Sequence, residues 1–509
     1  MKVEESSSQF LPPNWTWTRI GEIGQVITGT TPPKKDENNY GDFIPFVKPP
    51  QLNACGIDNA PDNLSEKGAK LARILPPNSV LVSCIGTLGK TGITRVPVAF
   101  NQQINAIILS TGVLPKFVFF YFQYSKTKER LNKIASATTI PIVNKSKFET
   151  IAFPLASTKE QTRIINRIEL LFSFLDAGVE SLRKVPLQLR CYRQVVLKYA
   201  VEGRLSEEWR KTNKNNLEPA RVLIEKIISN RRVQWEAAEF ARLAKNGKTI
   251  KNSEWKKRYK TPETPEIGSL PSLPEGWAWT NWNQISNWVT YGFTRPMPHV
   301  PKGISIITAK NVKNRRIEFE TADKTTQKAF SKLSEKDRPK SGDILITKDG
   351  TIGKASVVPD EVNFCINQSV AVIWLRSNPL DRNYLLTVIE SPVSQKLIWK
   401  KARGVAIQHL SITDFAKMTL PIPPLPEQSV ISAKVDRYFS ICDTVEKALQ
   451  ESLLQSKLLR QRILKNAFEG KIVPQDPNDE PAEMLLRLIK EQKRNENNNN
   501  SLGLMNYVK

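Results

Sequence analysis

Apolar and polar residues alternate along the chain in two distinct patterns, the first of which predicts β-strands. Short apolar runs end at Gly, Pro, Asn or Asp, a pattern typical of strands separated by turns. They are "SVLVSCIG" (79–86), "INAIILS" (104–110), "DILIT" (343–347) and "VAVIWL" (370–375). Longer stretches at Lys116–Ala135 and Arg382–Ala402 predict helices. The chain should therefore contain two β-rich regions with some helix.

The second pattern is an apolar seam with alternating steps of three and four residues, which predicts paired long helices. The seam positions are Ile164, Ile168, Leu171, Leu175, Val179, Leu182, Val185, Leu189, Tyr192, Val196 and Tyr199, and then Ile431, Val435, Tyr438, Cys442, Val445 and Leu449. Each helix would measure on the order of 65 Å. Pro186 interrupts only the first seam and should kink or restart that helix. Core helices of a bundle are the alternative interpretation.

The whole pattern occurs twice, which indicates a tandem duplication. The matching segments are "LPPNWTWT" (11–18) and "LPEGWAWT" (273–280), "GTLGK" (86–90) and "GTIGK" (350–354), "NQQINAIIL" (101–109) and "NQSVAVIWL" (367–375), "FPLASTKEQ" (153–161) and "LPIPPLPEQ" (420–428), and "QVVLKYAVEGRL" (194–205) and "QRILKNAFEGKI" (461–472). The last pair lies 267 residues apart. We therefore predict an α+β fold with two β-rich modules and a pair of long antiparallel coiled-coil helices, related by a pseudo-twofold axis.

The repeats also set the expected boundaries. These are 11–157 (module 1), 158–205 (central helix), 206–272 (basic helical insert and linker), 273–424 (module 2), 425–472 (C-terminal helix) and 473–509 (a partly disordered, Asn-rich tail). Antiparallel pairing of the helices would place the modules at opposite ends. Two basic modules held apart in this way could contact DNA segments one turn apart, ~34 Å, with the helices as a ruler.

Charge and composition narrow the function. The chain has 75 Lys and Arg against 50 Asp and Glu, a net charge of +25 that favours a polyanion such as nucleic acid. No apolar run of about 18 residues predicts a membrane span. The five scattered cysteines fit reduced thiols and a cytoplasmic location. With two histidines, His299 and His409, a His/Cys zinc site is not expected.

No catalytic motif is complete. A phosphate loop needs a Gly five positions before Gly89, but Cys84 occupies the place. In the second copy Lys348 takes that place, and Ala355 takes that of the hydroxyl residue. "VKPPQ" (47–51) has the wrong flanks for an amino-methyltransferase tetrad, and "PDNLSEKGAK" (61–70) lacks nuclease spacing. We expect no catalytic site and no bound metal or cofactor, although an NTPase or a stand-alone methyltransferase remains the enzymatic alternative.

The order of these motifs, present twice over about residues 11–490, resembles the specificity subunit of type I restriction-modification enzymes. That resemblance implies two target-recognition domains, each reading half of a bipartite, asymmetric double-stranded DNA site, with helices that set the gap. It implies two modification subunits that use S-adenosylmethionine, and restriction subunits that use ATP and Mg. A non-enzymatic adaptor or another basic DNA-binding scaffold is the remaining alternative.

Comparison of the copies gives a search set for DNA contacts. Features shared by both copies should serve the fold or contact phosphates, whereas divergent polar positions are candidates for base readout. The shared NQ residues, Asn101–Gln102 and Asn367–Gln368, should satisfy backbone groups. The search set is Thr30, Thr31, Lys34, Lys35, Lys90, Asn144, Lys145, Thr294, Arg295, Lys310, Asn311, Arg315, Arg316, Lys354, Gln408 and His409. Phe172 and Phe439 could dock modification subunits or pack in the core.

Overall fold

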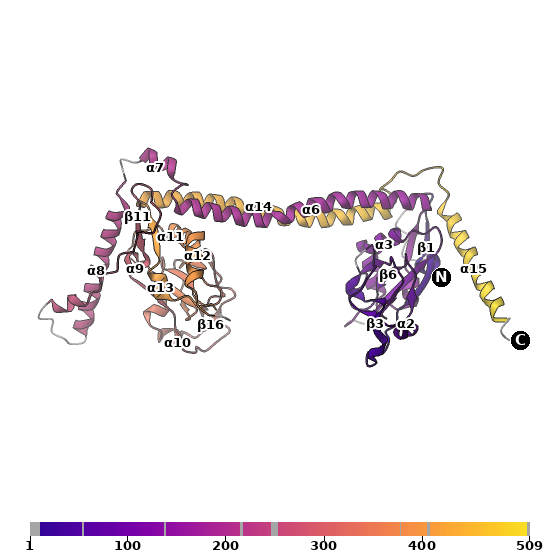
Figure 1. Ribbon diagram of the computed structural model, residues 1–509, viewed down its shortest axis with the longest axis horizontal. Coiled ribbons are helices and arrows are strands. Elements are labelled where there is room, and N and C mark those ends of the chain that lie inside the picture. Colours follow the sequence, from indigo (N-terminus) through magenta and orange to yellow (C-terminus); the bar gives the residue numbers. More distant parts are fainter. Residues whose placement is uncertain are drawn as a thin grey trace. The chain divides into compact units, whose positions relative to one another are not determined.

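The structure, a computed structural model, describes residues 11–52, 55–136, 139–213, 217–245, 253–376, 378–404 and 408–505. It forms two compact units, Met1–Arg183 with Leu449–Lys509, and Lys184–Ala448. Each unit contains one module and parts of both long helices. In Figure 1 module 1 is indigo to purple, and module 2 is pink to orange. The two units are described separately below.

Module 1 is built from two four-stranded sheets closed by a short strand pair. Its opening strand β1 (Thr16–Arg19) pairs antiparallel with its last strand β10 (Ala152–Leu155). The first sheet has the antiparallel order β2 (Gly24–Thr28), β9 (Ile104–Leu109), β6 (Val80–Ser83) and β7 (Thr91–Ile93). The second has the order β4 (Asn63–Leu64), β3 (Tyr40–Val47), β8 (Val98–Phe100) and β5 (Ile74–Leu75), in which β3 and β8 are parallel. Its helices are α1 (Ile20–Ile23), η1 (Glu37–Asn39), η2 (Pro49–Gln51), α2 (Glu66–Leu71), α3 (Pro115–Gln123), α4 (Ser125–Ile134) and α5 (Lys145–Glu149).

Module 2 repeats this plan with a different second sheet. β11 (Ala278–Asn281) pairs with β21 (Thr419–Ile422), and the main sheet has the order β12 (Trp288–Tyr291), β20 (Val370–Trp374), β17 (Ile344–Thr347) and β18 (Ala355–Val357). The other strands are β16 (Asp323–Thr325), β13 (Ile304–Ile307), β19 (Phe364–Ile366), β14 (Val312–Lys313) and β15 (Arg316–Ile317). The helices are α9 (Trp282–Ile285), α10 (Gln327–Ser331), η5 (Glu335–Asp337), α11 (Arg382–Glu390), α12 (Pro392–Lys401) and α13 (Ile412–Ala416). The equivalent main sheets agree with the predicted duplication.

Each predicted helix of the modules is in fact two helices. In module 2 the break falls at Ser391, which precedes Pro392, and a residue before proline avoids the helical region. In module 1 Tyr124 is extended, and the freed N–H of Ser125 donates to Oε1 of Gln461 at 2.8 Å. The apolar run of α3 is buried on all sides, with Phe117 against Phe153 and Phe468. Helix α3 therefore joins the module's β10 to the long C-terminal helix.

The two long helices are α6 (Thr158–Val201) and α14 (Leu425–Phe468), each of 44 residues. In the first unit the beginning of α6 contacts the end of α14, and in the second unit the end of α6 contacts the beginning of α14. The helices are therefore antiparallel (Figure 1), and the predicted α+β fold class is confirmed. Pro186 lies inside α6, so the predicted restart of the helix there is wrong. The helix continues through Pro186, which is exposed and lacks the N–H that another interior residue would donate.

The repeated Glu-Gln pair at the start of each long helix has a structural role. Gln161 accepts a hydrogen bond from the N–H of Leu114 at 2.8 Å, and Gln428 accepts one from the N–H of Asp381 at 2.9 Å. Glu427 is fully buried and accepts from Ser206 Oγ, Arg210 Nε and Trp277 Nε1. The motif thus fastens each module to its helix.

The segments after the long helices form further helices. They are α7 (Glu207–Asn213), α8 (Ala220–Lys245), η4 (Glu254–Arg258) and α15 (Ala482–Met505). Ile489 of α15 is buried against the core of module 1, and Lys493 donates to the carbonyl of Gly21. Helix α15 continues to Met505, and the predicted partial disorder of the tail stays a prediction, with residues 506–509 outside the described residues. No helix in the described residues is long and apolar enough to cross a membrane.

Candidate nucleic-acid interface

One end of the main sheet gathers several loops in each module, and we call it the loop edge. In module 1 Thr28 pairs with Asn105, and Ser83 with Ile104. Because neighbouring strands are antiparallel, the loop after β2, the loop before β9 and the turn after β6 all meet at this edge. They comprise residues 29–35, 101–103 and 84–90 in module 1, and 292–295, 367–369 and 348–354 in module 2.

The G-T-[LI]-G-K sequence is a turn between two strands of this edge. Gly86 and Gly89 have φ of 76° and 77°, and Gly350 and Gly353 have φ of 77° and 83°, values that favour glycine. The N–H groups of both glycines of the first turn bond within the chain: that of Gly86 donates to the carbonyl of Pro141 and that of Gly89 to the carbonyl of Ser83, each at 3.0 Å. A phosphate nest needs such N–H groups to point at the anion. The turn is therefore a structural element, as its two incomplete phosphate-loop motifs predict.

A second loop packs against this turn in both modules. The N–H of Val143 donates to the carbonyl of Cys84, and the N–H of Leu410 donates to that of Lys348. In module 2 the N–H of Gly350 also donates to the carbonyl of Gln408 at 2.9 Å. Loops 139–144 and 408–410 thus lie beside the repeated turn. The loop edge is one surface assembled from four separate segments of each module.

Comparison with known proteins identifies the family. A family model described as the type I restriction modification DNA specificity domain matches residues 12–180 and 299–455. This chain belongs to that family. Such proteins are the specificity subunits of type I restriction systems; they recognise DNA, act with partner subunits and are in general not catalytic.

The similarity to known relatives extends over nearly the whole length of both chains. The type I restriction enzyme EcoBI specificity subunit of Escherichia coli is 22% identical, covering 93% of this chain and 90% of the relative. The EcoDI specificity subunit of the same species is 24% identical, covering 92% and 91%. A chain of a type I R-M system, solved in a study of its assembly and conformational transition, has a TM-score of 0.58 and 18% identity, covering 91% of this chain and 99% of that one. This last likeness shows a shared fold.

In module 1 of the specificity subunit most of the search set lies at or beside the loop edge. The hydroxyl of Thr30 accepts from the N–H of Arg73, and Thr31 bonds to Gln102, which closes the loop after β2. Lys34 and Lys35 are exposed, and Lys90 is half-buried. Asn144 and Lys145 have local structural roles, because the Asn144 side chain accepts from the N–H of Lys147 and Lys145 pairs with Glu149 at 3.7 Å.

In module 2 the residues of the search set differ in their position relative to the loop edge. Thr294, Arg295, Lys354, Gln408 and His409 lie at or beside the loop edge, and Lys310 is exposed on the neighbouring loop after β13. The N–H of Ala309 in that loop donates to Ser369 Oγ, which joins it to the edge.

Two members of the module 2 set bond within the protein. The buried Asn311 side chain accepts from the N–H and hydroxyl of Thr308, so it supports its own loop. Arg315 donates to Glu390 and Asp436, both at 2.9 Å, and joins the β14–β15 turn to α11 and α14. Arg316 is exposed and pairs with Glu318. Their contact with bases stays a prediction, and these bonds favour structural roles for Asn311 and Arg315.

The predicted role of the NQ pair holds only for its first residue. Asn101 accepts a hydrogen bond from the N–H of Gln103 at 3.2 Å, and Asn367 accepts one from the N–H of Ser369 at 3.1 Å. Gln102 and Gln368 are exposed at the loop edge instead. A side chain shared by both modules and exposed there suits a common contact such as a phosphate.

Comparison of the two copies did not identify some further residues of the loop edge. Lys48 follows β3, whose last residue Val47 accepts from the N–H of Asn101, and it pairs with Asp62 at 2.5 Å. Arg73 reaches the carbonyl of Thr28 at 2.6 Å. Neither Lys48 nor Arg73 has an evident counterpart in the second copy. Their place at the loop edge becomes apparent only from the strand ends that lie next to them in the fold. Asp349 beside His409 belongs to the same group.

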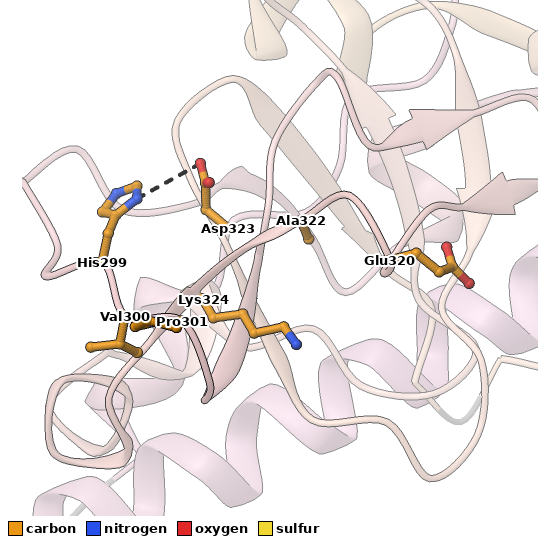
Figure 2. Close-up of a pocket in the computed structure, with 7 residues that line it drawn as sticks. All are labelled: His299, Val300, Pro301, Glu320, Ala322, Asp323 and Lys324. Carbon is orange, nitrogen blue, oxygen red and sulfur yellow. Dashed lines mark ion pairs between the residues drawn. The ribbon is translucent and has the colours of Figure 1, made fainter.

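Module 2 has a shallow surface depression. Figure 2 shows its lining residues, among them His299, Asp323, Lys324 and Glu320, around a volume of about 400 Å³. His299 Nδ1 lies 3.8 Å from Asp323 Oδ2, both exposed. Among the described residues no group of three His, Cys, Asp or Glu could hold a metal ion. The depression is open and polar, unlike the apolar clefts that enclose cofactors.

Proposed function

We propose that each recognition module of this specificity subunit reads one half of a bipartite, asymmetric double-stranded DNA site through its loop edge. The observation that carries the proposal is that the two edges share a backbone frame but differ in their exposed side chains. Equivalent turns follow β6 and β17, whereas Cys84 and Ile85 in one correspond to Lys348 and Asp349 in the other. A common frame with different side chains is what reading two different half-sites requires.

The helices would set the number of unread base pairs between the half-sites. Helices α6 and α14 are each 44 residues long and pair antiparallel within each unit, so together they would link the two modules. A change of helix length by whole turns would then change the gap and not the half-sites. In the cytoplasm, where its DNA target lies, the complex would methylate or cut according to this geometry.

The same helices would dock two modification subunits. Exposed apolar side chains recur at equivalent positions of the two helices, 267 residues apart, and form one set in each unit. The equivalent pairs are Phe174 with Ile441, Leu187 with Leu454, and Tyr192 with Leu459. Exposed apolar surface that is repeated in this way suits a partner present in two copies. Phe172, considered earlier for this role, is only 7% exposed and packs against Phe120 instead.

The chemistry would belong to those partners. S-adenosylmethionine would bind the modification subunits, and ATP and Mg would serve the restriction subunits. This chain would recognise the target DNA sequence. Titration of the isolated chain with S-adenosylmethionine and with ATP should give no binding heat. Substitution of Glu for Phe174 and for Ile441 should each remove one modification subunit in native mass spectrometry. Glu180→Gln, an exposed polar change on α6, is the matched control.

Sequencing of methylated bases in cells that express the complete system tests the function directly. The expected result is one bipartite motif whose first half changes when residues 11–157 are exchanged for the same region of a relative, with the second half and the gap preserved. A purified complex that shows no preference for any bipartite sequence at moderate salt would overturn the proposal. An unchanged motif after the exchange would favour an adaptor role instead.

A further inference from the structure

The two loop edges differ at one pair of residues that occupies the same backbone position in both modules. In module 1 Ile85 and Ile142 face each other as an isolated antiparallel bridge, and in module 2 Asp349 and His409 do so. The flanking backbone is also the same, because Ile142 bridges Ser136 just as His409 bridges Arg403. The frame is therefore constant, and only the side chains of this bridge pair change.

In module 2 the bridge pair forms a fixed hydrogen-bonding unit. Lys348 Nζ donates to both carboxylate oxygens of Asp349, at 2.9 and 3.0 Å, and lies 5.3 Å from the ring centre of Tyr291. Asp349 in turn bonds to Nδ1 of His409. The Lys348 side chain is only 6% exposed, so the charge of Asp349 is offset from within the protein. An anionic phosphate backbone nearby would thus meet little net repulsion from this carboxylate.

The carboxylate also decides which ring nitrogen of His409 carries hydrogen. Two groups face Nδ1: the Asp349 carboxylate, and Lys348 Nζ at the longer distance of 3.4 Å. Lys348 Nζ donates to Asp349 at shorter distances, and an ionised carboxylate only accepts hydrogen bonds, so we assign the hydrogen to Nδ1. The other nitrogen, Nε2, is then an acceptor in the neutral ring, and among the described residues it has no hydrogen-bond partner. The His409 side chain is 56% exposed. The loop edge of module 2 therefore presents one hydrogen-bond acceptor, His409 Nε2, on a ring that Asp349 holds in place.

In module 1 the same position is apolar. Ile85 is half-buried, and Ile142 is exposed beside the exposed Ile140. These side chains offer methyl groups and no hydrogen bond. In the major groove an acceptor pairs with the exocyclic amine of adenine or cytosine, whereas an apolar group packs on the methyl group of thymine. The two pairs thus match two different base edges.

We propose that the bridge pair is a specificity-determining element of both modules. In module 2 His409 Nε2 accepts a hydrogen bond from a base amine, and Asp349 is a positioning residue that fixes the ring. In module 1 Ile142 packs against a thymine methyl group. This inference rests on the proposed function, since it assigns particular base contacts to the half-sites that the modules would read.

The test uses the full chain in complex with its modification subunits and maps base preference at every position of both half-sites. His409→Ala should lower discrimination at one position of the second half-site by about tenfold, the value of one good base contact. The first half-site and the gap should stay unchanged. Ile142→Ser is the matched variant in module 1, and it should relax one position of the first half-site only.

A double variant separates positioning from direct contact. Asp349→Asn should relax the same base position as His409→Ala, because an amide no longer fixes the ring nitrogen. In the His409→Ala background, Asp349→Asn should have no further effect on that position, which is the non-additivity expected of two residues that act as a unit. An independent effect of Asp349→Asn at another position would overturn its role as a positioning residue.

The outcomes distinguish the inference from the proposed function. A complex that methylates a bipartite motif with the wild-type base preference in both His409→Ala and Ile142→Ser would overturn the inference alone. A wild-type complex without any bipartite motif would overturn the proposed function, and the inference with it. Because His409 is more than half exposed, its replacement should leave the thermal midpoint of the complex unchanged, which excludes misfolding as the cause.

Discussion

Arg193 in α6 pairs with Asp443 in α14, with 2.6 Å between Nη2 and Oδ1. The same guanidinium donates to Glu446 at 2.6 Å and lies 5.8 Å from the ring centre of Phe439. The duplication repeats the relationship in the other unit, where Arg460 pairs with Asp176 and covers the ring of a phenylalanine. One helix thus supplies the arginine and the other supplies the acid and the ring, in both units.

This arrangement predicts that the ring, and not the ion pair, stabilises the helix contact. Phe172 lies beneath Arg460 at 4.2 Å and is 7% exposed, so Phe172→Ala should lower the free energy of unfolding by about 3–5 kcal/mol. Asp176 is largely exposed, and Asp176→Asn should cost less than about 1 kcal/mol. Denaturant unfolding of both variants measures the difference. Equal losses would contradict the ranking.

A second prediction concerns the buried carboxylate of Glu427. It accepts from Ser206, Arg210 and Trp277, so an amide in its place leaves donors facing each other. Glu427→Gln should cost about 2–3 kcal/mol and speed hydrogen exchange in the helix Glu207–Asn213. Glu207→Gln is the control, because Glu207 is exposed and its one ion pair within the described residues is with Lys211 of the same helix. Unchanged exchange in that helix would show that Glu427 does not fasten it.

The ion pair between Arg163 and Asp479 should contribute to the pH dependence of the free energy of unfolding. The hydrogen bond from Arg163 lowers the pKa of Asp479 below its usual 3.8. A carboxylate whose pKa is lowered by folding stabilises the fold above its unfolded pKa and loses this contribution as the pH falls through the folded value. Wild type should therefore lose stability below about pH 4 more steeply than Asp479→Asn. Parallel profiles from pH 2 to pH 6 would exclude this contribution.

Much of this architecture could be predicted because the duplication doubles every signal. The strands at residues 80–83 and 344–347 and the antiparallel helices all follow from apolar spacing and repeated motifs. The helix breaks at Tyr124 and Ser391 were not predicted. A contact with Gln461 causes the first break and a proline ring the second, and both override the helical spacing of apolar residues. Local propensity carries no record of such tertiary contacts.

The site was less predictable than the fold. Comparison of the copies found His409 but missed Asp349, because the aspartate sits inside the repeated turn that was set aside as structural. It selected Arg315, whose guanidinium is bonded to Glu390 and Asp436. A difference between copies marks either a new base contact or a new internal contact, and only the three-dimensional partners distinguish the two.

The thiols should differ sharply in reactivity. Burial raises the pKa of Cys84 to about 12 and that of Cys365 to about 12, whereas Cys191 is exposed on α6. The thiolate is the reactive form. Iodoacetamide at pH 8 should therefore label Cys191 in the native chain and leave Cys84 and Cys365 unmodified until the chain is unfolded. Early labelling of Cys84, followed by peptide mass spectrometry, would show that the turn of module 1 opens readily.

Salt dependence should separate phosphate contacts from base contacts at the loop edge. Lys34 and Lys35 are exposed on the loop after β2 and have no ion pair in the structure's described residues, so they are free to meet phosphates. Replacement of both by Ala should weaken binding to all duplexes alike and reduce the slope of log K against log salt by about one per lysine that contacts a phosphate. His409→Ala should instead leave the slope unchanged and alter sequence preference. Titrations of the complex at several salt concentrations, on specific and scrambled duplexes, measure both quantities. A change in preference without a change in slope for the lysine variant would assign Lys34 and Lys35 to base readout.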